Sequence, residues 1–503
     1  FITTVNGGYF GQTQIGYKEW IFGTAGGRYD FSSAFGKSAG GVFYPKASLS
    51  VVPSDRQSWT NTIVSTLRLR AAIGQSGRQP GAFDQFTTFS PLVTSLGSGL
   101  LPSQLGNSDL RPEISTELEG GFEAGLFNNK VALEFTYWDR KVKDALVPRT
   151  FAQSGGFRAA QLTNIGEISA NGMEIALRGS PIQSANTRLE LFANAAYLKQ
   201  TLTSLGGAPP IRVSGGYARY RIYLKEGDPL GSIYEPRLAQ ACGAGGPATN
   251  SAGKPIACYT AGQLPINYAG RGTAATQAEL LAYFAQPRNI QSSAVQNVLQ
   301  PLLADYDGSG ILFEQRVGSS IPEWTGAFGG SFSFANHWKI QSTLEYRTGY
   351  LVSNLTDGFR LSQHPSIGSN RKEFSDVQSV MENPASTPEQ RVAAATEYIT
   401  KYRRLLEPGL NQGQNGSFLR WREIAVTYDL GADAAKRIGF RNANITLAGR
   451  NVFMWTKYPG QDPESNENGR GSTGTLADNF QNATDGFGLP IPRRVSIALN
   501  LGF

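Results

Sequence analysis

The side chains best suited to catalysis are scarce in this sequence. Only two histidines are present, His337 and His364, and they lie far apart without the spacing of metal ligands. No P-loop, zinc motif or Gly-x-Ser-x-Gly motif occurs. His337 falls in a predicted turn and His364 in a predicted loop, so we expect both side chains to be solvated. The sequence therefore predicts a non-enzymatic protein with no catalytic residue and no cofactor.

One segment has the beginning of a calcium-binding loop. In the sequence Asp305-Tyr-Asp-Gly-Ser-Gly310, the carboxylates of Asp305 and Asp307 fall at the first and third positions and a glycine follows. Such spacing can wrap a hard cation in oxygen ligands. The twelfth position is Arg316, where a complete calcium loop carries a bidentate glutamate. We therefore favour an ordinary turn, with a Ca²⁺ site at Asp305 and Asp307 as the alternative.

The only two cysteines, Cys242 and Cys258, flank a segment rich in glycine, proline and alanine. In an oxidising compartment they could close a small loop as a disulfide. Two free thiols in a loop are the alternative, and the sequence leaves both open.

Ligand binding is the other chemistry that these residue types allow. Arg68 and Arg70 alternate with apolar residues, so both point to the same polar face and could hold an anion. Four tyrosines of predicted loops could stack on sugar rings: Tyr217, Tyr220, Tyr223 and Tyr234. Local packing is the alternative role for these tyrosines.

Composition indicates which elements must position these residues. The chain has 59 glycines and 11% aromatics, whereas charged residues supply only 17%, below the roughly 25% of soluble globular proteins. No apolar run reaches the roughly 18 residues that a membrane-spanning helix needs. The net charge of +7 comes from dispersed Lys and Arg without a basic block, which argues against nucleic-acid binding. A membrane protein of this composition is predicted to be an all-β, antiparallel transmembrane barrel.

The C-terminus carries the clearest strand signal. Apolar Val495, Ile497, Leu499 and Leu501 alternate with small or polar residues, and the chain stops on Phe503. This pattern has one face for lipid and one for a wet lumen. A terminal phenylalanine on such a strand resembles the assembly signal of bacterial outer-membrane barrels. An edge strand of a soluble sandwich is the alternative.

The same alternation recurs along the chain and predicts about 14 to 16 strands. Two hairpins turn at Asn128-Asn129 and at Asn336-His337, whereas Trp421 is out of phase with the strand that follows it. Asn171-Gly172 suggests a bend or bulge. Long polar connections alternate with turns of two to four residues, and they span 204–320, 354–416 and 457–489. Helical patterning within them covers 276–305 and 388–407. Long loops at one end are typical of outer-membrane barrels, where they lie outside the cell.

Several segments resemble the C-terminal half of the SusC/RagA-type TonB-dependent transporters. The most specific is Asn107-Ser-Asp-Leu-Arg-Pro-Glu113, with the strand, turn and returning strand that follow it. Others are Gly416-Ser-Phe-Leu-Arg-Trp-Arg-Glu-Ile424, Arg450-Asn-Val-Phe-Met-Trp-Thr-Lys-Tyr-Pro-Gly-Gln-Asp-Pro-Glu464 and Pro490-Ile-Pro-Arg-Arg494. Their order along nearly the whole chain, together with the terminal Phe503, makes the resemblance specific.

The resemblance implies active import of an oligosaccharide or peptide across the bacterial outer membrane. Such transporters have a barrel of about 22 strands, an N-terminal plug, a TonB box that engages TonB, and a SusD-like surface lipoprotein as a lid. Outer-membrane lipid and the barrel-assembly machinery are the other expected partners. Because no signal peptide, plug or TonB box is visible, we expect residues 1–503 to be the C-terminal part of one barrel domain. A passive porin or adhesin-like barrel and a secreted carbohydrate-binding β-protein are the alternatives.

Overall fold

The computed structural model describes most of the chain. The described residues are 4–36, 40–95, 97–149, 151, 154, 156–157, 160–212, 221–286, 298–357, 372–402, 413–465 and 484–503. Among these residues, no helix combines the length and the apolar character needed to cross a membrane.

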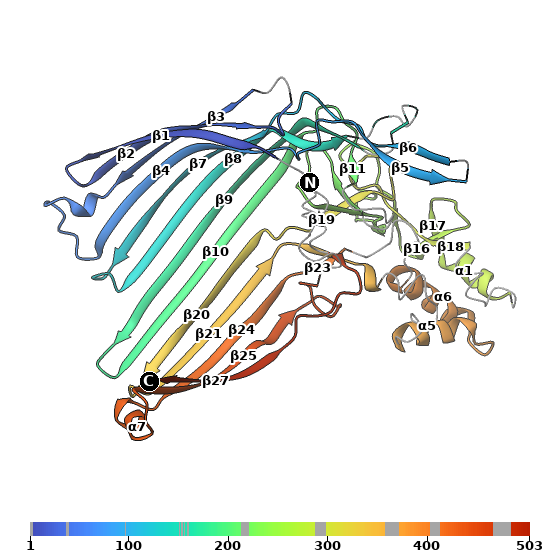
Figure 1. Cartoon of the computed structure of the whole chain (residues 1–503). Helices are drawn as coiled ribbons and strands as arrows, with labels where there is room; N and C mark the ends of the chain where they lie inside the picture. Colours follow the sequence, from blue (N-terminus) through green and yellow to red (C-terminus); the bar gives the residue numbers. More distant parts are fainter. Residues whose placement is uncertain are drawn as a thin grey trace.

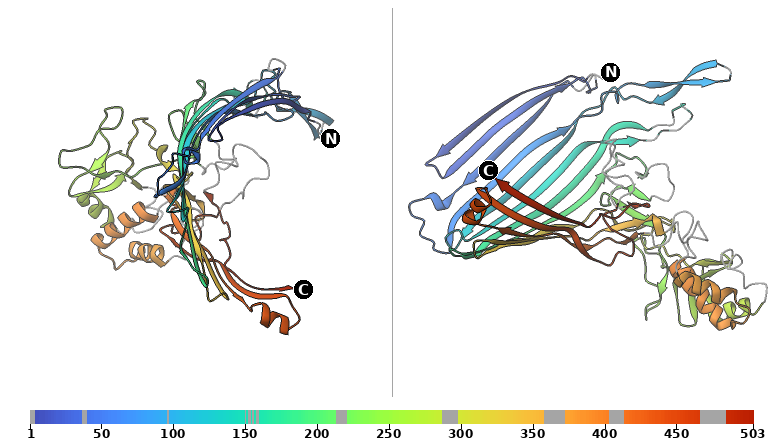
Figure 2. Two further views of the ribbon diagram at one scale, coloured as in Figure 1. Left: turned by 90° about the vertical axis from the view of Figure 1, so that its left-hand side faces the viewer. Right: turned by 60° about the horizontal axis from the view of Figure 1, so that its bottom comes forward.

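The dominant element is a curved antiparallel sheet, called the wall below (Figure 1). Its thirteen strands, in spatial order, are β1 (Asn6–Tyr17), β2 (Ile21–Ser32), β3 (Val42–Val51), β4 (Val64–Arg78), β7 (Glu113–Leu126), β8 (Val131–Arg149), β9 (Gln161–Gln183), β10 (Thr187–Ser204), β20 (Trp324–Phe334), β21 (Trp338–Thr348), β24 (Phe418–Asp429), β25 (Asn442–Thr456) and β27 (Arg494–Gly502). Seen along the strands, the wall is an open arc with β1 and β27 at its edges (Figure 2). The barrel architecture is as predicted, although the wall of the described chain has thirteen strands and not 14 to 16. The other strands belong to small sheets in the loops.

Most wall strands present mainly apolar residues on one face, called the outer face, and mainly polar or small residues on the other, called the inner face. On β25 and β27, Leu447 lies opposite Ile497 with exposed fractions of 51% and 72%. Their neighbours Ala448 and Ser496 pair on the other face. Large apolar side chains exposed along a whole sheet face require an apolar surrounding, which lipid supplies.

A bulge explains the position of Trp421. The pairing of β24 with β21 and β25 shifts register between Trp421 and Glu423. The extra residue lets Trp421 share the outer face with Ile424, where its indole nitrogen donates to Ser342 Oγ at 2.8 Å. Such an insertion re-aims side chains without breaking the sheet. Arg420 and Arg422 consequently both reach the inner face.

At one end of the wall, most strands are joined by tight turns; we call it the short-turn end. Asn128 and Asn129 adopt φ values of 58° and 61° in the β7–β8 turn, where left-handed backbone is required. Two connections there are longer than predicted: 52–63, and 430–441, which contains the helix α7 (Ala432–Arg437). An aromatic belt covers the outer face nearby, with Trp338 and Tyr428 ring centroids 4.7 Å apart. Such belts mark the interface between lipid and water.

Asn171-Gly172 does not bend the chain, contrary to prediction. Both residues lie inside β9, paired with β8 and β10. A Cβ on Gly172 would lie 2.5 Å from Trp138 Cζ2 and 2.4 Å from the Tyr197 carbonyl oxygen. Glycine therefore makes room for the indole ring across the strand.

Long connections fill the opposite end, called the long-loop end. In the part of the chain that the structure describes, they contain small sheets and several helices, and these helices lie together on one side of the wall (Figure 2). The small strands are β5 (Thr88–Thr94), β6 (Gly97–Gln104), β11 (Ile211–Arg212), β12 (Ile222–Leu224), β13 (Ser232–Glu235), β14 (Gln240–Ala241), β15 (Cys258–Tyr259), β16 (Gln263–Tyr268), β17 (Ala274–Thr276), β18 (Leu299–Pro301), β19 (Gln315–Ser319), β22 (Leu351–Asn354), β23 (Gly413–Asn415) and β26 (Thr484–Asp485). The helices are α1 (Gln277–Phe284), α5 (Lys372–Glu382) and α6 (Pro388–Glu397).

The described residues test part of each predicted helix. Within 276–305 the described residues form α1 and then, contrary to prediction, the strand β18, while 287–297 lie outside the described residues. Within 388–407, α6 and a π-helical turn, Tyr398–Tyr402, follow the prediction, and 403–407 lie outside the described residues. These elements share a core that includes Leu280, Phe284 and Ile399. The short apolar runs are therefore explained by tertiary packing of several elements, which periodicity alone does not distinguish from one long helix.

Acid should weaken the start of α1. Glu279 forms a capping box with Thr276 and accepts from Arg271 Nη1 at 2.7 Å. The Arg271 hydrogen bond first, and then the backbone and side chain of Thr276, lower the pKa of Glu279 to about 2. Since the pKa of an unfolded glutamate is about 4.3, this stabilisation is present above that value and is lost as the pH falls towards 2.

We therefore expect proteolysis within α1 of the wild type to accelerate as the pH falls from 4.5 to 2, measured with a protease that is active over that range. Glu279→Gln keeps a neutral cap but loses the titration, so its cleavage rate should depend less on pH in the same window. The same pH dependence in both proteins would contradict this assignment.

Candidate functional site: the polar inner face and its long-loop end

The inner face of the wall is lined with charged side chains. The register places alternate residues of β4, β7, β8 and β9 on this face. Those with charge or aromatic character include Arg68, Arg70, Arg78, Glu113, Glu117, Glu119, Glu123, Glu134, Trp138, Arg140, Glu174 and Arg178. Arg140 pairs with Glu117 at 2.5 Å and lies 5.1 Å from the Trp138 ring centroid. A wall that is apolar outside and charged inside can border an aqueous path.

Arg68 and Arg70 lie on this inner face, as predicted, but beside a carboxylate. Glu123 is 3.7 Å from Arg68 and 3.5 Å from Arg70. Arg68 also donates to Ser50 Oγ, and Arg70 to Thr136 Oγ1. The shared carboxylate reduces the positive potential that the two guanidinium groups offer to an anion. Anion binding here remains a prediction.

The loop tyrosines have structural contacts. Tyr234 is only 3% exposed, and its hydroxyl donates to Asp228. Burial and the Asp228 carboxylate raise the pKa of Tyr234. Tyr223 donates to Glu314 Oε1 at 3.0 Å and packs edge-on against Tyr234, with ring centroids 5.4 Å apart.

This arrangement corrects the prediction for Tyr234, because a buried ring cannot stack on a sugar in this conformation, and it favours packing for Tyr223. Tyr217 and Tyr220 lie outside the described residues.

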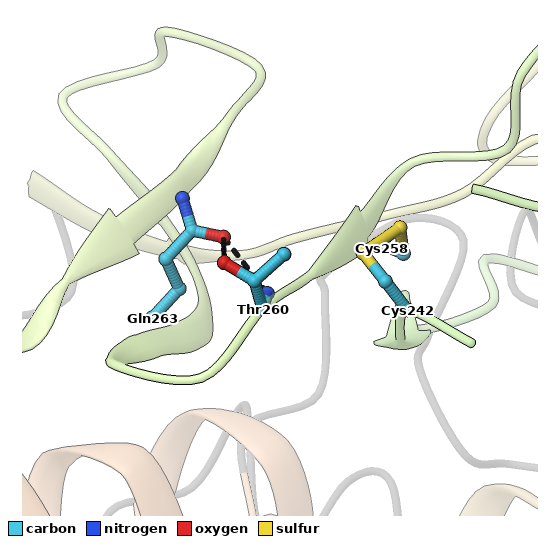
Figure 3. The surroundings of a disulfide bond; sticks show 4 residues. All are labelled: Cys242, Cys258, Thr260 and Gln263. Carbon is cyan, nitrogen blue, oxygen red and sulfur yellow. Dashed lines mark hydrogen bonds between the residues drawn. A yellow bond between two sulfur atoms is a disulfide. The ribbon is translucent and has the colours of Figure 1, made fainter. Parts of the chain in front are cut away.

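Cys242 and Cys258 form a disulfide whose Cα atoms are 5.0 Å apart (Figure 3). Beside it, Gln263 Oε1 accepts from both the backbone nitrogen and the hydroxyl of Thr260, at 2.8 and 2.9 Å. The disulfide holds the start of β15 in place, and these two hydrogen bonds hold the start of β16. Among the described residues, no three His, Cys, Asp or Glu side chains are grouped to hold a metal.

A cluster of six charged residues, which the sequence did not reveal, lies where the inner face reaches the long-loop end. We call it the ion cluster; it comprises Glu345, Arg347, Arg420, Arg422, Asp462 and Glu464. Three arginines face three carboxylates, so the formal charges balance. The cluster joins β21 and β24 to the loop that follows β25.

Arg420 is the most buried member of the ion cluster, with its side chain 4% exposed. Its guanidinium is 2.5 Å from Asp462 Oδ1 and 2.7 Å from Glu464 Oε2. Arg422 bridges Glu464 and Glu345 at 2.5 and 2.6 Å. Buried charges are tolerated only with such paired partners. The pairing therefore fixes the loop against the wall.

A small apolar core and a hydrogen bond also hold the loop that follows β25 against the wall. Tyr350, Val352, Phe418 and Tyr458 form a small core. The Tyr458 hydroxyl donates to Asp485 Oδ2 at 2.8 Å. Two of the motif segments that carry the family resemblance, 416–424 and 450–464, meet here. The sequence shows the charges of these segments but not that they face one another.

At the short-turn end, the terminal Phe503 is 86% exposed and lies edge-on to Phe440, with ring centroids 5.2 Å apart. Its strand β27 pairs only with β25 among the described strands. The assembly role of Phe503 remains a prediction.

Comparisons with known proteins agree with this architecture. Residues 1–254 match the family described as TonB dependent receptor-like, beta-barrel. The chain is 26% identical to TonB-dependent receptor P26 of Formosa agariphila, covering 98% of this chain and 46% of the relative. It is 23% identical to TonB-dependent receptor P3 of the same organism, covering 98% and 45%.

Among solved structures, the one titled "Structure of the RagAB peptide transporter" superposes with a TM-score of 0.71 at 19% identity, covering 99% of this chain and 48% of that chain. A second structure of RagAB, titled as a peptide importer in the 'open-open' state, gives a TM-score of 0.68 at 18% identity, covering 99% and 47%. The chain spans about half the length of the curated relatives it matches.

Proposed function

Since the chain belongs to the TonB-dependent receptor-like β-barrel family and lies in the bacterial outer membrane, we propose that the whole protein actively imports a nutrient across that membrane. The observation that carries the proposal is the two-faced wall: an apolar outer face for lipid and a charged inner face for an aqueous path. Import of this kind moves cargo by binding and gating. It needs no bond chemistry, so we propose a transporter and not an enzyme.

The cargo that we propose is an oligosaccharide or a peptide. A solved structure of similar fold is titled a peptide transporter, which supports the peptide class. Charged inner-face pairs such as Arg140 and Glu117 suit a zwitterionic or polar cargo, because each can exchange its partner for a cargo group. Gating would come from a plug outside residues 1–503, coupled through TonB.

Uptake by cells tests active import. Cells that express the full-length protein would receive labelled oligopeptides or labelled oligosaccharides, with and without a protonophore. We expect accumulation of one class, abolished by the protonophore, because TonB coupling draws on the proton-motive force. Uptake insensitive to the protonophore would indicate a passive pore, and uptake of neither class would refute the proposed cargo.

We also propose a SusD-like lipoprotein as the partner at the long-loop end. The similarity to RagAB supports it, and the described loops at that end pack around a buried apolar core of their own. Affinity purification of the full-length protein from mildly solubilised outer membranes should recover a lipoprotein in a stoichiometric ratio. Its absence under conditions that keep the barrel folded would refute the partner while leaving import untouched.

A further inference from the structure

The segment from Asp305 to Gln315 folds like the first part of a calcium loop. Oxygen ligands of such loops come from positions one, three, five and seven, the last through a backbone carbonyl, and glycine occupies position six. Here these positions hold Asp305, Asp307, Ser309 and the carbonyl of Ile311. Gly310 has a φ of +76°, the left-handed backbone that the sharp turn needs.

A side-chain nitrogen occupies the point on which these oxygens converge. Gln315 is fully buried, at 0% exposure. Its Nε2 lies 3.3 Å from Asp305 Oδ1 and 3.0 Å from Asp307 Oδ1. The same nitrogen lies 3.3 Å from Ser309 Oγ and 2.9 Å from the Ile311 carbonyl oxygen. Its two hydrogens are thus shared among four acceptors.

The orientation of the Gln315 amide follows from its other atom. Gln315 Oε1 accepts from the backbone nitrogens of Tyr306 and Asp307, at 2.8 and 3.0 Å. Exchanging the amide oxygen and nitrogen would direct the NH₂ group at two N–H donors and would point the amide oxygen at both carboxylates, where it would repel them. The hydrogen-bond pattern therefore requires nitrogen, and not a coordinating oxygen, at the centre.

The last ligand position also opposes a metal ion. Arg316, at position twelve, carries a positive charge where calcium needs a bidentate carboxylate. Its Nε is 3.5 Å from Asp228 Oδ1, so it is directed away from the loop into another ion pair. The donor set thus lacks the carboxylate that would complete a site for Ca²⁺.

We propose that the Gln315 amide takes the place of a calcium ion, so that this loop is held together without a metal ion. The loop also connects segments of the long-loop end that are distant in the chain. Asn250 Nδ2 donates to the Asp305 carbonyl at 3.2 Å, and Ser251 Oγ donates to the Asp307 carbonyl. The Tyr306 hydroxyl donates to the Leu238 carbonyl at 2.9 Å. Two carboxylates that would otherwise repel each other are held together by hydrogen-bond donors and not by a cation.

Calcium titration of the purified full-length protein in detergent tests the proposal. We expect no stoichiometric heat of Ca²⁺ binding, and no change on adding EDTA in the rate of proteolysis between residues 221 and 320. Stoichiometric Ca²⁺ binding by the wild type at this loop, or faster cleavage there in EDTA, would overturn it. If the double variant Asp305→Asn, Asp307→Asn still bound Ca²⁺, that site would lie elsewhere in the protein. The wild-type loop would then still be metal-independent.

Replacing Gln315, at the centre of the loop, provides a second test. Gln315→Glu brings a third carboxylate to the four oxygens, so we expect loop cleavage to accelerate several-fold without Ca²⁺ and to slow again with Ca²⁺. The affinity should be weak, with a Kd of roughly 10⁻⁴–10⁻³ M, because Arg316 remains. Gln240→Glu, an exposed glutamine in the same loop region, is the matched control and should show no calcium response. If Gln315→Glu fails to fold, the wild-type titration still decides.

Discussion

Replacing Arg420 with methionine is expected to destabilise the folded protein by about 3–5 kcal/mol, since it removes the cation that pairs with the buried Asp462 and one of the cations that pair with Glu464. Asp462 and Glu464 have side-chain exposures of only 2% and 8%, so water cannot replace the guanidinium. The free energy of unfolding, from urea titration of the protein refolded into lipid vesicles, would measure the loss. Faster proteolysis of the loop around Asp462 should accompany it.

Arg450→Met is the matched control. Arg450 also pairs with a glutamate of the inner face, Glu423, at 3.0 Å, but their side chains are 64% and 39% exposed. Exposed pairs contribute at most about 1 kcal/mol. Equal losses from Arg420→Met and Arg450→Met would contradict a special role for the ion cluster. A double variant that also carries Asp462→Leu should lose less than the sum of the two single changes, because one unpaired charge is then removed.

Arginine in place of Leu177 is expected to destabilise the wall by about 2–4 kcal/mol in a bilayer. Leu177 lies on the outer face of β9, is 43% exposed, and faces Leu133 and Ala193 on the neighbouring strands. A guanidinium at this depth must leave water or deform the lipid. The unfolding free energy in vesicles and the heat-modifiable gel mobility would report the effect.

Ala176→Arg supplies the control one residue away. Ala176 lies on the inner face, opposite Glu134 on β8 and Asn194 on β10. An arginine there reaches a polar surface and a carboxylate, so we expect a change below about 1 kcal/mol. If Ala176→Arg proved as damaging as Leu177→Arg, the assignment of the outer and inner faces would be wrong.

Period-two alternation and turn chemistry are local properties, and this is why they could be read from the sequence. The β7–β8 and β20–β21 hairpins turn at the predicted asparagines. The terminal strand has its apolar face where alternation placed it. Long connections also group at one end as expected. The strand β18, inside the segment 276–305 predicted as helical, was not predicted, because it forms by pairing with β16 earlier in the chain.

For the site residues too, local features could be predicted and contacts between distant segments could not. Arg68 and Arg70 were placed on the correct face, since alternation decides the face of a strand residue. Their shared partner Glu123 lies on another strand, and no local pattern indicates it. Burial of Tyr234 likewise depends on Asp228 and on the fold of its loop.

By itself, then, the sequence determined the two-faced strands, the tight turns and the apolar C-terminal strand, because each depends on the spacing of residues within one segment. Tertiary structure alone decided the bulge that brings Arg420 and Arg422 to one face, their pairing with Glu464, and the position of Gln315 among carboxylates. These features depend on distances between segments remote in the chain. Such distances are set when the strands pair and the loops pack, and no spacing along a single segment encodes them.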